Sequence, residues 1–127
     1  MKLAGFAVLA LFGLWLAYRG TIWPSKWHTG FASFYGLDSA KEGLNERTAC
    51  GARFSPREFA AASWQFPCFT WLRVERLDTR KSVRVVVWDK GPALWTGRQL
   101  DLTPTAFSRL DALAQGVIPV RYRIDSP

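Results

Sequence analysis

The sequence predicts an all-β barrel or sandwich with one or two short helices, preceded by an N-terminal hydrophobic helix. Three observations support this fold class. The chain has 127 residues, and roughly 100 of them follow an apolar N-terminal stretch, which is the size of one domain. A hydrophobic content of 49% with 15% aromatic residues excludes a disordered chain. Several short alternating or β-branched segments are separated by turn residues, whereas only one clear helix signal follows them.

The N-terminal stretch is uncharged from residue 3 to residue 18 and is flanked by Lys2 and Arg19. As a helix it would be about 24 Å long, against roughly 30 Å of hydrocarbon in a bilayer. No small-x-small cleavage signal lies near Ala17 and no lipobox cysteine is present, so an uncleaved anchor is favoured over a removed signal peptide. We therefore expect a signal-anchor or transmembrane helix over residues 1–20 that contacts the membrane through residues 3–18.

Residues 21–29 contain a proline and a serine and lie between Gly20 and Gly30, which indicates a linker, so the barrel domain is expected over residues 30–127. Its first strand is predicted over 31–35, where apolar and polar residues alternate. A polar, glycine-bearing loop is expected over 37–45, and 59–64 is a short buried run.

A hairpin follows these elements. Residues 70–77 alternate, residues 82–88 are strongly β-branched, and residues 78–81 between them have turn composition. This is the clearest local pattern in the chain.

The second hairpin strand ends at the Lys-Gly-Pro sequence of residues 90–92, which a loop follows. Thr103 as N-cap and Pro104 as first helical residue predict a helix over 105–113. A last strand is predicted over 117–124. Many short strands with so little helix are typical of barrels and sandwiches.

The net charge of +7 comes from 17 Lys and Arg against 10 Asp and Glu. Three of the cations precede the globular part, so 14 cations face 10 anions there, a net charge of +4. No basic run is longer than the Arg-Lys pair at 80–81, so the stripe that tracks nucleic-acid phosphates is missing and no nucleic-acid partner is expected. A polyanionic wall or membrane surface suits this charge.

Two cysteines, Cys50 and Cys68, have 17 residues between them. A disulfide is their simplest use and would stabilise the domain by about 3 kcal/mol, although two unpaired buried thiols stay open as an alternative. A disulfide persists only in an oxidising compartment, so it would place residues 27–127 outside the cytoplasm, in the cell envelope, with a secreted or virion-associated form as a further option. No His or Cys cluster suggests a metal site, and neither a metal nor an organic cofactor is expected.

Three blocks occur in order: Gly-Phe-Ala-Ser-Phe-Tyr-Gly at 30–36, Thr-Ala-Cys-Gly-Ala-Arg-Phe at 48–54, and Val-Val-Val-Trp-Asp-Lys-Gly-Pro at 85–92, followed by Leu-Asp-Leu-Thr-Pro-Thr-Ala-Phe at 100–107. Together they resemble the double-psi β-barrel domain of the rare lipoprotein A and expansin superfamily, over nearly all of residues 30–124. The resemblance implies a six-stranded double-psi β-barrel with an open groove for a polysaccharide. Bacterial members are lytic transglycosylases that act on peptidoglycan, expansins loosen walls without evident hydrolysis, and others only bind.

The resemblance also supports pairing of Cys50 with Cys68, because their positions match the cystine-bearing members. It implies that Asp89 is the catalytic acid/base, whereas the sequence alone slightly favours an aspartate that caps a turn. One carboxyl group suffices for a transglycosylase: it protonates the glycosidic oxygen and then accepts a proton from the muramoyl 6-hydroxyl. To be protonated near neutral pH, Asp89 would need desolvation by neighbours such as Trp88 or Trp95.

Four further residues are candidates for substrate binding: Tyr35, Thr48, Trp95 and Asp101. Tyr35 and Asp101 match family blocks, and Trp95 lies in the loop after Asp89, where an indole can stack on a sugar. Each also has a structural alternative. The aromatic rings can be packed, Thr48 can bond to the barrel wall, and Asp101 can cap the following helix.

Two departures from the family pattern weaken the enzyme hypothesis. Ala52 stands where enzymatic relatives carry an acidic residue, and Ser63 stands where they commonly carry a histidine. Glu46 or Glu58 could replace the missing carboxylate in space, although the spacing does not show it. The only histidine, His28, is interpreted as a linker residue.

The leading hypothesis is therefore an anchored, extracytoplasmic barrel that binds peptidoglycan glycan strands and cleaves them as a lytic transglycosylase. One alternative is a non-catalytic, expansin-like module that binds glycan or loosens the wall. A second alternative is a structural component of an envelope complex or of a phage particle.

Overall fold

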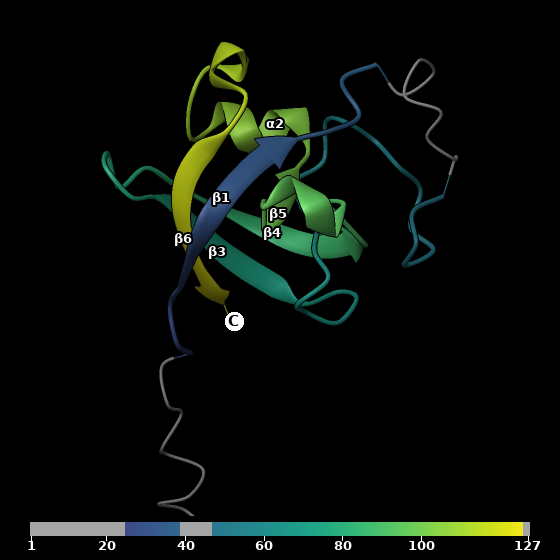
Figure 1. Cartoon of the computed structure of the whole chain (residues 1–127). Helices are drawn as coiled ribbons and strands as arrows, with labels where there is room; N and C mark the ends of the chain where they lie inside the picture. The colour runs from purple at the N-terminus through teal and green to yellow at the C-terminus, as the bar shows by residue number, and fades with distance from the viewer. Residues whose placement is uncertain (1–24, 39–46, 126–127) are drawn as a thin grey trace, which may run out of the picture.

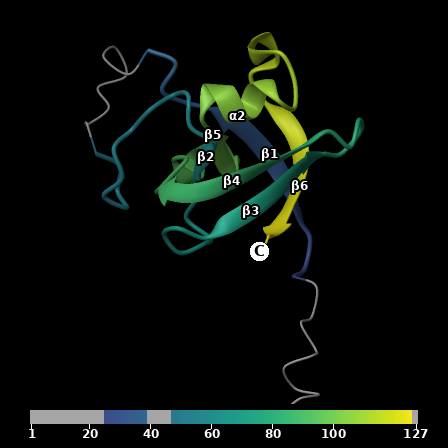
Figure 2. The same cartoon turned by 180° about the vertical axis from the view of Figure 1, so that it is seen from behind.

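The computed structural model describes residues 25–38 and 47–125, which form a closed six-stranded barrel (Figures 1 and 2). The order of strands around the barrel is β1-β5-β2-β4-β3-β6. The strands are β1 (His28–Phe34), β2 (Ala60–Ala62), β3 (Trp71–Arg76), β4 (Ser82–Asp89), β5 (Leu100–Leu102) and β6 (Ile118–Ile124). The predicted all-β barrel is thereby confirmed.

Two strand pairs are parallel, β1 with β5 and β2 with β4, and all other neighbours are antiparallel. The predicted hairpin is confirmed as β3 and β4, which pair from Trp71 opposite Val86 to Glu75 opposite Ser82. The two parallel pairs join segments that are far apart in sequence. The parallel pairing of β2 with β4 and the antiparallel pairing of β2 with β5 bring the ends of β2 and β4 beside β5.

The core lies inside the barrel and follows from side-chain alternation along the strands. Leu72 and Val74 of β3 and Leu100 and Leu102 of β5 are fully buried. Phe107 is fully buried as well and packs edge-on to Phe34, with ring centroids 5.1 Å apart. Helix α2, which carries Phe107, thus contributes to the core.

The helices are short: α2 (Pro104–Ser108) and two 3-10 turns, η1 (Leu94–Thr96) and η2 (Leu113–Gln115). The predicted start of α2 is confirmed, because the Thr103 hydroxyl accepts a hydrogen bond from the Ala106 amide and Pro104 follows it. The predicted end at residue 113 is wrong. The Leu110 amide bonds to the carbonyl of Phe107, three residues back, and this tighter turn buries Leu110 in the core.

Two further predictions need correction. Strand β5 lies in a segment for which the sequence predicts a loop, because a three-residue strand gives too short an alternation to detect. Strand β1 begins at His28, which pairs with Tyr122 and stacks on its ring with centroids 5.5 Å apart. His28 is therefore a barrel residue rather than a linker residue.

Several predictions lie outside the described residues: the N-terminal hydrophobic helix, the start of the linker and most of the 37–45 loop. Within residues 25–38 and 47–125, no helix is long and apolar enough to cross a membrane.

Candidate active site

The candidate site is built on one row of residues that crosses four neighbouring strands. Ala62 of β2 pairs with Asp89 of β4 on one side and with Asp101 of β5 on the other, and Asp101 pairs with Ser33 of β1. Neighbouring strands are about 4.8 Å apart, so the backbones of Asp89 and Asp101 lie roughly 10 Å apart. Asp101 lies between two core leucines in sequence, so its side chain faces the outside of the barrel.

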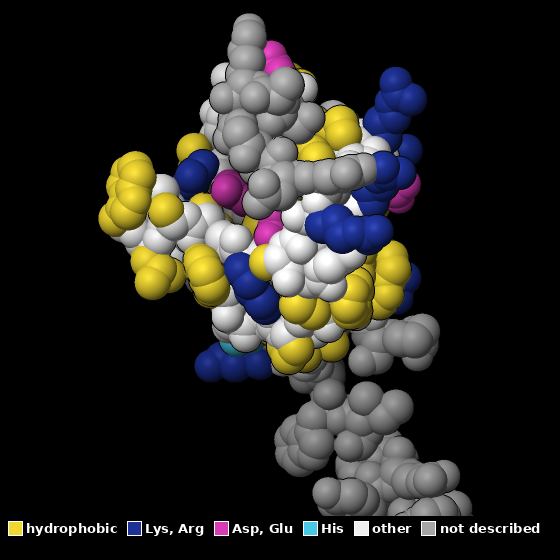
Figure 3. Space-filling view, turned by 90° about the vertical axis from the view of Figure 1, so that its right-hand side faces the viewer, with side chains coloured by type: hydrophobic (Ala, Val, Ile, Leu, Met, Phe, Trp, Pro, Cys, Tyr) yellow, Lys and Arg dark blue, Asp and Glu magenta, His cyan; other side chains and the backbone are white. Residues whose placement is uncertain are grey.

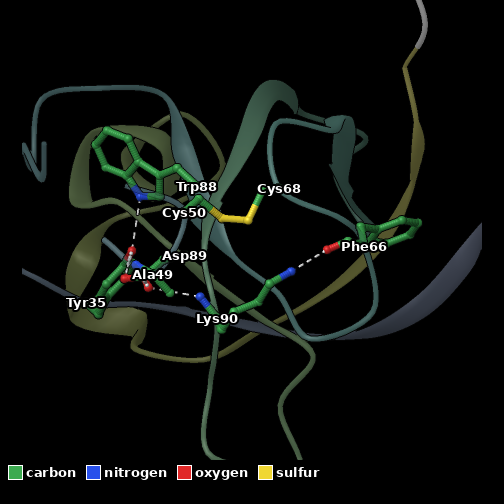
Figure 4. Close-up of a disulfide and its surroundings, with 8 residues drawn as sticks. All are labelled: Tyr35, Ala49, Cys50, Phe66, Cys68, Trp88, Asp89 and Lys90. Carbon is green, nitrogen blue, oxygen red and sulfur yellow. Dashed lines mark hydrogen bonds between the residues drawn. A yellow bond between two sulfur atoms is a disulfide. The ribbon is translucent and has the colours of Figure 1, made fainter. Parts of the chain in front are cut away.

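Asp89 is the last residue of β4 and is half-buried. Its carboxylate accepts three hydrogen bonds (Figure 4). Oδ1 accepts from the backbone amides of Ala49 and Lys90, each at 2.9 Å, and Oδ2 accepts from the Tyr35 hydroxyl at 3.1 Å. The Lys90 ammonium points elsewhere and donates to the Phe66 carbonyl at 2.8 Å. Asp89 is thus held by neutral donors rather than by an ion pair.

Tyr35 joins Asp89 to a buried indole. Its hydroxyl donates to Asp89 and accepts a hydrogen bond from Nε1 of Trp88 at 3.1 Å. Burial, followed by the negative charge of Asp89, raises the pKa of Tyr35 far above its ordinary value of 10.0. The hydroxyl therefore keeps its proton and remains a donor to the carboxylate. Trp88 is buried and packs against Phe54, with centroids 5.7 Å apart.

The predicted disulfide between Cys50 and Cys68 is confirmed. The amide of Cys50 donates to the carbonyl of Trp88 at 3.1 Å, so the disulfide-bearing segment is attached to β4 beside Asp89 (Figure 4). This attachment positions the Ala49 amide that bonds to the carboxylate. Thr48, which precedes Ala49 in the chain, is buried. Its hydroxyl has no hydrogen-bond partner in the described part of the chain.

Asp101 belongs to a second polar cluster. A guanidinium nitrogen of Arg98 lies 3.5 Å from its Oδ1, and the Ser33 hydroxyl bonds to both side chains. Sequence reasoning missed Arg98 and Ser33. Arg98 could have been found from its three-residue spacing to Asp101. Ser33 had no such signal, because it lies beside Asp101 only through the parallel pairing of β1 and β5.

The predicted aromatic residue Trp95 is in η1 and is 89% exposed. The aromatic residue that contacts Asp89 is instead Tyr35, which is hydrogen-bonded in turn to Trp88. A second exposed indole, Trp64, was not predicted: its Nε1 donates to the Pro92 carbonyl at 2.8 Å. A pocket of about 210 Å³ lies between Trp64, Leu94 and Arg98. Figure 3 shows hydrophobic side chains projecting from one face of the molecule beside acidic and basic ones.

The two residues that depart from the family pattern, Ser63 and Ala52, have different surroundings. Ser63 is buried, and its amide donates to the carbonyl of Asp89 at 3.0 Å, so this position adjoins the candidate acid. Its hydroxyl accepts from the Gln65 amide at 3.1 Å. The carbonyl of Ala52 accepts from the Thr48 amide at 2.7 Å, in the same loop as Ala49.

Only one of the two proposed replacement carboxylates lies in the described part of the chain. Glu58 is exposed, and its carbonyl accepts a hydrogen bond from Thr103 at the start of α2. Glu46 lies outside the described residues. Among residues 25–38 and 47–125, no group of three His, Cys, Asp or Glu side chains is arranged to hold a metal ion.

Comparison with known proteins agrees with this fold. Residues 28–122 match the family model described as lytic transglycolase. The chain is 36% identical over 99 residues to a protein named "Probable endolytic peptidoglycan transglycosylase RlpA" of Aquifex aeolicus, covering 78% of this chain and 42% of the relative. It is 38% identical over 95 residues to the protein of that name from a Nostoc species, covering 75% of this chain and 25% of the relative. The chain thus spans less than half the length of these relatives.

A crystal structure of a Clavibacter michiganensis expansin in complex with cellohexaose superposes with a TM-score of 0.61. It is 24% identical and covers 80% of this chain and 51% of the expansin. The likeness shows that the two proteins share the barrel fold.

Proposed function

Because the chain belongs to the lytic transglycolase family of double-psi β-barrel domains, we propose that it binds peptidoglycan glycan strands and cleaves them without water. The observation that carries the proposal is the carboxyl group of Asp89, held at the end of β4 by three neutral donors. The names of the relatives, endolytic peptidoglycan transglycosylases, support this substrate class.

In the proposed reaction, protonated Asp89 gives its proton to the glycosidic oxygen as the bond from that oxygen to C1 of the muramoyl residue breaks. The amides of Ala49 and Lys90 and the hydroxyl of Tyr35 stabilise the carboxylate that forms. The carboxylate then accepts the proton of the muramoyl 6-hydroxyl while that oxygen bonds to C1. The product is a 1,6-anhydro end, and Asp89 returns to its protonated state.

The remaining side chains supply binding surface in this proposal. Trp95 and Trp64 offer exposed indoles for stacking on sugar rings, and the hydrogen bond to Pro92 holds the Trp64 ring in one orientation. The cluster of Asp101 and Arg98 offers polar groups beside the pocket next to Trp64. Thr48 belongs to the loop that carries the Ala49 amide, but its side chain is buried and adds no exposed binding surface.

The proposal includes a location in the cell. The disulfide between Cys50 and Cys68 requires an oxidising compartment, which supports a barrel outside the cytoplasm. The uncharged run at residues 3–18 supports anchoring of that barrel to a membrane.

The test is digestion of purified peptidoglycan sacculi with the oxidised full chain, with products read by mass spectrometry. We expect 1,6-anhydromuramoyl ends from the wild-type protein and a loss of activity on the order of 10²- to 10⁴-fold in Asp89→Asn. Asp78→Asn is the matched control, because Asp78 is exposed and bonds to Arg76 away from the site. The control should cleave like wild type.

A second candidate function is a non-catalytic, expansin-like glycan binder. Ser63 favours it, because a hydroxyl next to Asp89 cannot exchange protons near neutral pH as a histidine can. This function predicts that wild type and Asp89→Asn sediment equally with sacculi and that neither releases fragments. Failure of both proteins to sediment would refute both functions.

A further inference from the structure

The outer surface of β3, β4 and β6 carries a set of cationic and aromatic side chains that the proposed reaction does not use. Arg73 of β3 pairs with Arg84 of β4 on one side and with Arg123 of β6 on the other. Three arginines therefore stand in one row across three neighbouring strands. We define the arginine–tryptophan face as these three with Arg121, Trp27 and Trp71.

Both tryptophans of this face are stacked with arginines. The guanidinium of Arg84 lies 4.2 Å from the ring centroid of Trp71. The guanidinium groups of Arg121 and Arg123 lie 4.2 Å and 4.4 Å from the ring centroid of Trp27. These cation–π contacts hold the charged groups in place against flat apolar rings. The face therefore presents indole and guanidinium groups together, which is a suitable surface for a membrane interface.

The acidic residues on this surface neutralise only part of its charge. Glu75 bonds to Arg121 at 2.7 Å and to Arg73 at 3.5 Å, and Asp125 bonds to Arg84 at 3.2 Å. Four arginines thus face two carboxylates. Like charges directly opposite each other destabilise a sheet, so an external anion would relieve the repulsion within the arginine row.

The N-terminal segment joins the barrel beside this face. The Ser25 hydroxyl donates to the carbonyl of Ile124 at 2.6 Å, so the start of the described chain is fixed to the end of β6 (Figures 1 and 2). Only residues 19–24 separate Ser25 from the uncharged run at 3–18. Six residues span at most about 22 Å, so an anchor in the bilayer would keep this end of the barrel close to the lipid headgroups.

We propose that the arginine–tryptophan face docks onto anionic phospholipid headgroups of the membrane that holds residues 3–18. The inference rests on the proposed anchoring. The charge of the face selects anionic over neutral lipid, and Trp27 and Trp71 lie at headgroup level. Docking in this way sets the orientation of the barrel relative to the membrane.

The test uses the full chain incorporated into lipid nanodiscs, with a donor dye on the barrel and an acceptor dye on lipid headgroups. Because both native cysteines are in the disulfide, an introduced cysteine is the single reactive thiol. Ile124→Cys places the donor at the end of β6 beside the face, and Ser108→Cys places it on α2 at the other end of the barrel (Figure 1). The nanodiscs contain either phosphatidylcholine alone or a mixture with phosphatidylglycerol.

We expect energy transfer from the Ile124→Cys donor to rise about twofold in the anionic nanodiscs and to fall back in high salt. Transfer from the Ser108→Cys donor should not rise. Adding Arg84→Gln with Arg123→Gln should abolish the rise. The matched pair Arg47→Gln with Arg57→Gln removes the same charge from exposed positions outside the face and should preserve it.

Equal transfer in both lipid mixtures, or a rise that survives loss of Arg84 and Arg123, would overturn the inference. So would a result in which soluble polyphosphate, but not phosphatidylglycerol, binds in an Arg84-dependent manner, because the face would then serve a soluble polyanion. A chain that does not incorporate into either nanodisc would refute the anchoring and the docking together, while sacculus cleavage would still report separately on the Asp89 reaction.

Discussion

Two regions of the outer barrel surface differ in how their charges are balanced. Around Asp89 a single carboxylate is held by neutral donors: two backbone amides and the Tyr35 hydroxyl. On the arginine–tryptophan face, cations outnumber anions and are held by ion pairs and indole rings. The same closed barrel supports both regions, because its core uses only the inward side chains of each strand.

The difference shows what each region suits. The Asp89 carboxylate makes no ion pair in the described part of the chain, so the proton transfers proposed for it would break no salt bridge. The excess guanidinium groups on the other face keep their charge at every physiological pH and suit steady attraction to an anionic surface. Substitutions in each region should therefore have different consequences for stability, cleavage and binding.

Removing the disulfide should disturb the Asp89 region most. Cys50→Ser with Cys68→Ser opens a loop with a sequence separation of 18 and should lower the free energy of unfolding by about 3 kcal/mol. Because Cys50 bonds to the backbone of β4, activity should fall as well. Chemical denaturation in oxidising and reducing buffer measures the stability change. If the oxidised and the reduced wild-type proteins had the same free energy of unfolding, this expectation would be contradicted.

Replacing Tyr35 with phenylalanine should lower the cleavage rate by about 10- to 100-fold, because Asp89 loses one donor and the Trp88 indole loses its acceptor. Burial and the Asp89 charge raise the pKa of Tyr35, so its hydroxyl stays protonated as pH rises through neutrality. The ratio of wild-type to Tyr35→Phe rates should therefore be constant from about pH 6 to about pH 9. A ratio that falls steadily over this range would show that Tyr35 ionises.

Removing an exposed tryptophan should separate the two regions by ligand. Trp95→Ala should weaken sedimentation with sacculi by about fivefold and leave the unfolding free energy unchanged, because the ring is 89% exposed. Trp71→Ala is the matched control on the other face, where its indole stacks with Arg84. Equal loss of glycan binding in both variants would mean that Trp95 has no specific role.

The smallest effect is expected for Glu75→Gln. Burial acts to raise the pKa of Glu75, but hydrogen bonds and charge from Arg121 and Arg73 outweigh it and lower that pKa. A lowered pKa adds stability above the unfolded value of about 4.3, and this stability is lost as pH falls through the folded value. The variant should therefore lose about 0.5 kcal/mol at about pH 7 and show no loss at an acid pH below the folded pKa of Glu75. An equal loss at both pH values would point to packing instead.

Much of the fold was predictable because its signals are local. Alternation of apolar residues identified the hairpin of β3 and β4, and Thr103 with Pro104 identified the start of α2. Asp89 was identified at a strand end from the β-branched run before it and the Gly-Pro sequence after it. The resemblance to a known family then supplied the barrel type and the acid/base hypothesis for Asp89, and it strengthened the expected pairing of Cys50 with Cys68.

The amino-acid sequence alone was thus enough to identify most of the strands, the candidate acid and the two cysteines. Three groupings became visible only in the folded barrel: Tyr35 and Trp88 at Asp89, Arg98 and Ser33 at Asp101, and the row of three arginines. The physical reason is how far apart in sequence the interacting residues are. Strand periodicity and helix caps are set by neighbours in sequence, whereas the contacts of Tyr35 and of Ser33 require a closed barrel that aligns residues more than 50 positions apart.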